Sequence, residues 1–188
     1  MSIDSLSVWK STLAALPKVE DSSWSLSFAS WYTSRIVNIT TNPSSLVPLG
    51  FSSTFATTVF KDALAALGPS SSAAAGIAGF AGAWEDALNA TVIVVGPGSF
   101  APPTSPPTMF SLVTTTTITP ASIAAGKAKI LELVTAPLVS DPNDSLFPQK
   151  FRDATLLLKI TIVGLDSQPP PAAGPGPQSL TISNVPLI

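Results

Sequence analysis

Ionic side chains are scarce in this chain, and that scarcity limits the kind of surface it can present to water. The 188 residues include 9 Lys or Arg and 11 Asp or Glu, which is 11% of the sequence, whereas soluble domains average about 25%. A folded chain of this size exposes roughly 8,500 Å², so twenty charges give about one per 420 Å². We therefore expect a surface that other subunits largely cover.

Missing residue types exclude several kinds of site. The chain has no His and no Cys, which removes Cys/His zinc sites, iron–sulfur clusters, disulfides and Ser-His-Asp triads. The net charge is −2, and the closest basic pairs are Lys127/Lys129 and Lys150/Arg152. Proteins that bind nucleic acid neutralise its phosphates with a patch of clustered Lys and Arg residues, which these two pairs do not form. We expect no cofactor, no metal, no nucleic acid and no small-molecule substrate.

Membrane and export signals are not evident. The longest run of apolar and small residues, 73–84, stops at Glu85-Asp86 and is shorter than the roughly 20 residues that span a bilayer. The first six residues, Met-Ser-Ile-Asp-Ser-Leu, do not form a basic segment that leads into an apolar run. We expect neither a signal peptide nor a membrane partner.

Helical periodicity dominates the first half of the chain. Apolar residues recur at steps of three and four, which predicts four helices. Candidate caps and stops set their ends, with Ser52/Ser53 taken as the cap of the third helix and Phe55, Val59, Ala63 and Leu67 as its apolar stripe. The four predicted helices cover residues 3–16, 24–39, 55–67 and 72–89.

The composition changes near residue 90 towards β-branched residues. Residues 91–95 and 109–119 predict strands, with Gly96–Ser99 as a turn, and 122–134 predicts a helix. Alternation over 156–164 predicts a further strand, with a short helix before it. A helix continuing from Phe147 to Leu158 is the competing interpretation, so the sequence leaves 147–158 open between helix and strand.

Two Pro-rich segments interrupt regular structure, at residues 101–107 and 168–177. The fold class we predict is α+β: an N-terminal helical unit, then a small β-containing half, then a Pro-rich extended C-terminal arm. The corresponding boundaries are 1–89 for the helical unit, 90–166 for the mixed part of the same domain, and 167–188 for the arm.

Two segments are candidate subunit interfaces. Gly76, Gly79 and Gly82 leave a smooth face on the fourth helix, where a backbone can approach closely. That backbone belongs either to a neighbouring subunit or to the same domain. In the arm, the apolar residues are expected to add an edge strand to a neighbour. These arm residues are Leu180, Ile182, Val185 and Leu187.

Aromatic and acidic residues offer weaker functional hypotheses. Trp9, Trp24, Trp31 and Trp84 all fall on predicted helix faces and are interpreted as core residues. Paired carboxylates for hydrolysis must face each other across a cleft. Glu85 and Asp86 are adjacent on a helix and diverge, so we predict no enzyme. A surface adhesion or carbohydrate-binding module, with the Trp residues lining a groove, remains an alternative.

Four features of the chain occur together: low charge, abundant Ser, Thr, Ala and Pro, extended arms, and no catalytic motif. In this overall character the chain resembles the small virion structural proteins of tailed bacteriophages. The resemblance implies a structural subunit of the tail, baseplate or head–tail junction (neck), with copies of itself and other particle proteins as partners. A capsid-associated decoration protein is the alternative within this class. The implied location is the virion, assembled in the host cytoplasm.

Overall fold

The computed structural model describes residues 4–16, 24–36, 47–48, 51–67, 72–96, 98–100, 108–135, 146–166 and 178–186. Over these ranges the chain is an α+β protein, as predicted. The helices are α1 Leu6–Ala14, α2 Trp24–Ile36, α3 Thr57–Ala66, α4 Ala73–Asn89, α5 Pro120–Leu131, the short 3₁₀ helix η1 Glu132–Val134, and α6 Leu146–Leu156. The strands are β1 Val47–Pro48, β2 Phe51–Thr54, β3 Val92–Val95, β4 Gly98–Phe100, β5 Thr108–Ile118, β6 Lys159–Asp166 and β7 Gln178–Pro186.

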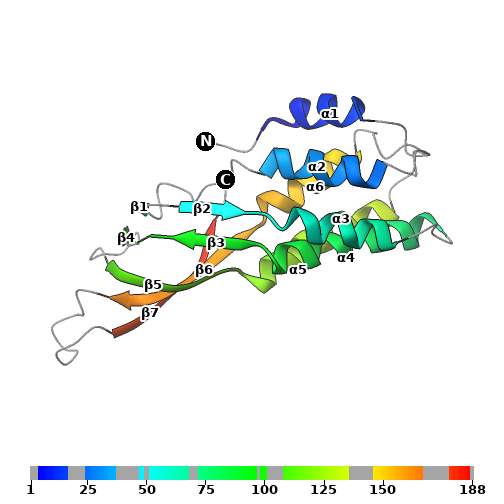
Figure 1. The fold of residues 1–188 in the computed structure, drawn as a ribbon. Helices are drawn as coiled ribbons and strands as arrows, with labels where there is room; N and C mark the ends of the chain where they lie inside the picture. Colours follow the sequence, from blue (N-terminus) through cyan, green and yellow to red (C-terminus); the bar gives the residue numbers. More distant parts are fainter. Residues whose placement is uncertain are drawn as a thin grey trace.

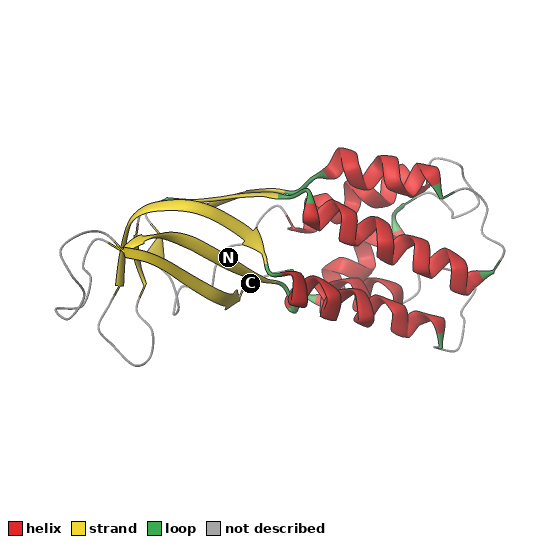
Figure 2. Cartoon of the chain, turned by 90° about the horizontal axis from the view of Figure 1, so that it is seen from below, coloured by secondary structure: helices red, strands yellow, loops and turns green. Residues whose placement is uncertain are grey.

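Helices and strands occupy opposite ends of the molecule. The helices gather into one body, and the strands extend from it as a curved sheet (Figures 1 and 2). Helices α3 and α4 connect β2 to β3, and helices α5 and α6 connect β5 to β6. The chain therefore leaves the sheet twice and returns to it, which joins the N-terminal and C-terminal parts in one structure.

All strand pairs are antiparallel. The larger sheet has the order β1-β4-β5-β6-β7, and β2 pairs with β3 in a two-stranded sheet. β1 and β2 are close in sequence, as are β3 and β4, and β3 contacts β5, so the two sheets lie side by side. The range predicted as a helical unit, 1–89, also contains β1 and β2, which pair with strands of the following part.

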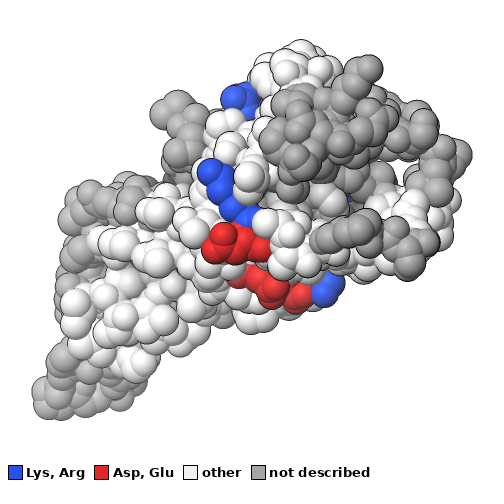
Figure 3. Space-filling view, turned by 45° about the vertical axis from the view of Figure 1, so that its right-hand side comes forward, with Lys and Arg blue, Asp and Glu red and all other residues white. Residues whose placement is uncertain are grey.

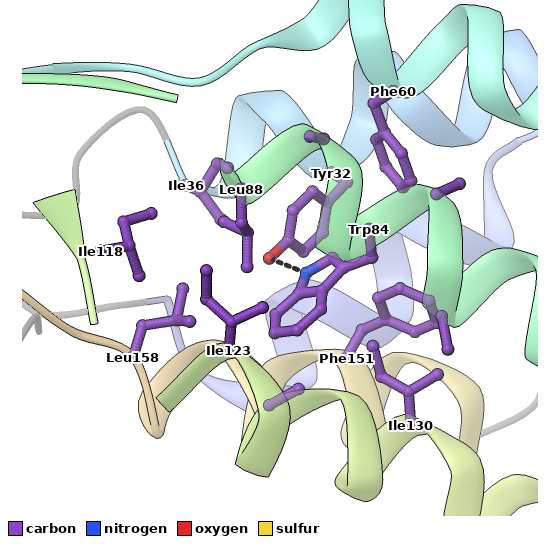
Figure 4. Packing of buried hydrophobic residues seen from close by; sticks show 14 of the residues in the cluster. Tyr32, Ile36, Phe60, Trp84, Leu88, Ile118, Ile123, Ile130, Phe151 and Leu158 are labelled. Atoms are coloured by element: carbon purple, nitrogen blue, oxygen red, sulfur yellow. Dashed lines mark hydrogen bonds between the residues drawn. The ribbon is translucent and has the colours of Figure 1, made fainter. Parts of the chain in front are cut away.

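A single apolar cluster joins the two ends of the molecule. Helix residues Trp84, Phe28 and Phe151 are fully buried in it, and so are Ile160 and Ile162 of β6. Figure 4 shows Trp84 packed between helices, with its indole nitrogen pointing to Tyr32. The Trp84 Nε1 donates to the Tyr32 hydroxyl at 2.7 Å, and that hydroxyl bonds Thr155 Oγ1 at 2.8 Å. The polar atoms of these buried side chains are thereby satisfied.

Periodicity predicted the positions of the first four helices well. α1, α2 and α4 begin and end within a few residues of the expected ranges, and Ser72 caps α4 by accepting from Ala75 N at 3.1 Å. The range predicted for the third helix, 55–67, agrees with α3, but the predicted cap was wrong. Residues 51–54 pair with β3, so Ser52 and Ser53 are strand residues, and α3 begins at Thr57. Its buried residues are Phe60 and Leu64, while the predicted stripe residue Val59 is 38% exposed.

The second half follows its predicted order with two corrections. β3, β5 and α5 match the expected strand, strand and helix. Residues 146–156 are helical and β6 starts at Lys159, so the competing helical interpretation was the better one. Gly98 and Ser99 are not in a turn. They form β4, which pairs with Phe110 and Met109 of β5.

The C-terminal segment also differs from its prediction. Residues 178–186 do form a strand, but β7 pairs with β6 of the same chain, with Leu180 opposite Gly164 and Val185 opposite Ile160. Val185 is 2% exposed in the chain's own core. One edge of this segment is therefore used within the chain's own sheet, so a strand added by a neighbour has to pair with its other edge. Leu187 and the Pro-rich segments 101–107 and 168–177 lie outside the described residues.

Candidate functional site

Charge is divided unevenly between the helical body and the sheet. Of the charged residues in the described part of the chain, two lie on strands: Lys159 and Asp166, at opposite ends of β6. Figure 3 shows the Lys, Arg, Asp and Glu side chains gathered over the helices, while the described sheet surface in that view carries none. Soluble surfaces normally intersperse charges of both signs, so the sheet is the unusual part of this molecule.

One side of the sheet is open to water. Successive side chains in a strand point to opposite faces, and Ile93, Val95, Ile118, Ile160 and Ile162 point into the core. The exposed residues that alternate with them define what we call the outer face. The outer face consists of Thr54, Val92, Val94, Leu112, Thr115, Thr117, Ser179 and Thr181. These members are hydroxyl-bearing or aliphatic, and the charge that strand alternation adds to this face is that of the exposed Lys159, at the start of β6 beside the helices.

Three aliphatic side chains on this face are unusually exposed. Val92 is 60% exposed, Val94 is 57% exposed and Leu112 is 51% exposed, which are the three largest values among the exposed large hydrophobic residues of the described chain. Fully burying such a side chain stabilises a contact by about 1.5–3 kcal/mol. The local reason for their exposure is strand alternation: pointing Ile93 and Val95 into the core turns Val92 and Val94 outward.

The helical body carries a network of ion pairs. The Glu132 carboxylate lies 2.7 Å from Lys129 Nζ through Oε1 and 2.5 Å from Lys150 Nζ through Oε2. Glu85 Oε2 lies 2.5 Å from Lys127 Nζ. Hydrogen bonds from Lys129 and Lys150 hold the pKa of Glu132 below its usual value, and the hydrogen bond to Glu132 raises the pKa of Lys129. Pairs this exposed contribute little to folding. They mark a surface that is well suited to water.

The three glycines of the predicted interface have different surroundings in the structure. A Cβ at Gly79 would come 2.6 Å from Leu67 Cδ2 of the same chain, which is the close contact within the domain that the sequence left open. A Cβ at Gly82 would meet nothing within 4 Å. Gly76 is half-buried near the start of α4. Gly79 is thus explained by its own fold, while Gly82 faces free space.

Other candidate residues are placed in ways that do not form a site. Trp9, Trp31 and Trp84 are buried in the core, and the Trp24 side chain lies outside the described residues. Glu85 is held by Lys127, whereas Asp86 is exposed and is not brought to a second carboxylate by these contacts. In the described ranges, no group of three acidic side chains is close enough to hold a metal ion.

A shallow groove of about 560 Å³ lies between α1 and α2. Its lining combines hydroxyls with apolar carbon: Thr12, Leu16, Leu26, Ser27, Ser30, Trp31, Ser34 and Arg35. The one charged group, Arg35, is engaged by Asp4 at 2.9 Å, and Trp31 Nε1 donates to Thr12 Oγ1 at 2.9 Å. With these polar groups already paired, the groove presents little to recognise a ligand.

None of the known family models, curated proteins or solved structures matches this chain. No helix in the described part of the chain has both the length and the apolar character to cross a membrane. The outer face was not found from the sequence, because it needs the pairing of strands that are far apart in the chain. The sequence feature that could have indicated this face is the lack of charged residues in 87–126 and 167–188.

Proposed function

We propose that this protein is a non-enzymatic structural subunit of a large assembly, in which the outer face of the sheet contacts neighbouring subunits. The observation that carries the proposal is that Val92, Val94 and Leu112 are strongly exposed on a face whose described charge is confined to Lys159, at the start of β6. The partners are further copies of this chain and other structural proteins of the same particle.

The physical basis is the cost of leaving such a face in water. Exposed aliphatic groups gain free energy when a neighbour covers them. Threonine and serine hydroxyls can exchange water for hydrogen bonds across a contact, and faces with so few charges repel each other weakly when many copies adjoin. The charged helical body then remains in contact with solvent.

The setting we propose is a bacteriophage particle, at the tail, baseplate or head–tail junction. This part rests on the compositional resemblance alone. A capsid-associated decoration protein is the alternative within the same class, and it differs in its position on the particle. The adhesion alternative needs an exposed aromatic groove, and the burial of Trp31 and Trp84 in the core does not favour it.

The test is the mass of the purified chain in solution, measured by sedimentation over a range of concentrations. We expect species heavier than the monomer. Val94→Asp places a carboxylate in the contact and is expected to weaken association at least about tenfold, because burying an unpaired charge costs several kcal/mol. Val59→Asp is the matched control, since Val59 is exposed on α3 of the helical body.

Two results would contradict the proposal. One is a wild-type chain that stays monomeric at every concentration and in the presence of its particle proteins. The other is equal behaviour of Val94→Asp and Val59→Asp, which would mean that the outer face is not the contact surface.

A further inference from the structure

Along one side, the edge strand β7 has no strand partner in the part of the chain that the structure describes. Among the described strands it pairs with β6 alone, which leaves the backbone N–H and C=O groups of its other edge without a strand partner. Its nine residues, Gln178–Pro186, contain no charge. An exposed edge without charge is a template for adding another strand.

The two edges of the sheet are protected to different degrees against pairing with a strand of another chain. Proteins protect edge strands by making them short, by placing Pro or charge on them, or by inserting a bulge. At one end, β1 has two residues and includes Pro48, and β2 has four. At the other end, β7 has an irregularity between Ile182 and Val185 and then Pro186. The five residues before it, 178–182, carry none of these protections.

The lengths of these edges indicate what can occupy β7. Pairing β7 of one copy with β1 of the next would use two residues, one of which is a proline that cannot donate, and pairing with β2 would use four. Pairing β7 with β7 of a second copy offers five residues from each chain. An antiparallel pair of identical strands has two-fold symmetry, which is the commonest symmetry of soluble oligomers. Since neither strand is charged, the pairing brings no like charges together.

We propose that β7 pairs antiparallel with β7 of a second copy across a two-fold axis, which joins the two sheets edge to edge. This inference rests on the proposed structural role and specifies one of its contacts. With the axis at Leu180, Thr181 of one copy lies opposite Ser179 of the other. Both residues are on the outer face, where a Thr–Ser pair can hydrogen-bond across the strands. The outer faces of the two copies then form one continuous surface, whose described charge is the Lys159 at the start of β6 in each copy.

The test uses the natural absence of cysteine. Chains with Ser179→Cys are mixed with chains carrying Thr181→Cys, and the mixture is oxidised mildly. A disulfide needs Cα atoms within about 7 Å, so we expect a cross-linked dimer that contains one chain of each kind. Ala125→Cys, exposed on α5, is the control for random collision. In parallel, Thr181→Lys is expected to weaken association at least about tenfold, with Ala125→Lys unchanged.

The outcomes separate this inference from the proposed function. Cross-linking between positions 179 and 181, together with weakened association of Thr181→Lys, supports it. A second outcome is that Val94→Asp weakens association, Thr181→Lys does not, and cross-linking stays at the level of Ala125→Cys. This outcome overturns the β7 pairing and leaves the structural role standing. A chain that never associates overturns both. Circular dichroism of each variant confirms that it has folded.

Discussion

At the residue scale, the most constrained group is the hydrogen-bonded set formed by Trp84, Tyr32 and Thr155. Its atoms come from α4, α2 and α6, so it holds three helices in register. Thr155 Oγ1 also donates to Phe151 O at 2.8 Å. The sequence identified Trp84 as a core residue, but it gave no sign of the hydroxyl partners, since a Tyr and a Thr so far apart in the chain meet only after folding.

Replacing the central hydroxyl should destabilise the chain. Tyr32→Phe keeps the ring but leaves Trp84 Nε1 and Thr155 Oγ1 without the bonds that Tyr32 provided, which costs about 1–3 kcal/mol in the free energy of unfolding. Urea denaturation measures the change. An exposed control, Thr58→Val on α3, is expected to change the free energy much less. Equal stability of Tyr32→Phe and the wild type would show that the hydroxyl is not bonded as described.

Burial also makes Tyr32 a reporter of alkaline unfolding. Desolvation raises its pKa to about 12, against the opposing effects of the hydrogen bonds with Thr155 and Trp84, whereas an unfolded tyrosine has a pKa near 10. The folded state therefore holds the proton more tightly. This stabilisation is complete below about pH 10 and is lost as the pH rises towards 12, by up to about 3 kcal/mol.

The measurement is direct, because Tyr32 is the only tyrosine. Tyrosinate absorbance should rise with a midpoint well above pH 10 in the folded chain and near pH 10 in urea. Tyr32→Phe should lose the absorbance change altogether. A folded chain whose tyrosinate signal has its midpoint near pH 10 would mean that the hydroxyl reaches water.

At the element scale, local patterns predicted what local forces decide. Helices with a regular apolar face and a clear cap, such as α4, were predicted nearly to the residue. Errors arose where pairing between distant strands decided the structure: residues 51–54 join β3 instead of capping α3, and Gly98 continues a strand instead of turning. The outer face shares this origin, since its residues come from strands separated by whole helices.

Two helical glycines should respond in opposite ways to alanine. A Cβ at Gly126 of α5 would overlap the Trp84 ring and come 3.0 Å from Ala154 O, so Gly126→Ala should destabilise the chain by about 1–3 kcal/mol. Gly82 has room for a methyl group, so Gly82→Ala should stabilise α4 by roughly 1 kcal/mol. Urea denaturation of both variants is the check. Destabilisation by Gly82→Ala in the monomer would contradict the described packing.

At the scale of the whole molecule, the charged side chains lie mainly on the helical body, and those of the described strands are Lys159 and Asp166, at the two ends of β6 (Figure 3). Composition predicted that neighbours cover the surface, and the structure shows where the charge is lowest. The C-terminal segment, expected to reach a neighbour by itself, instead completes the chain's own sheet and becomes its open edge. Contact with neighbours is thus proposed through a folded surface rather than through a free arm.

Hydrogen exchange followed by mass spectrometry at low and high protein concentration tests this account most directly. We predict that residues 108–118 and 178–186 exchange more slowly as concentration rises, because neighbours cover β5 and β7, while residues 57–66 of α3 exchange at an unchanged rate. If the strand segments exchange equally at all concentrations, or if the slowing occurs in α3 instead, the sheet is not the contact surface.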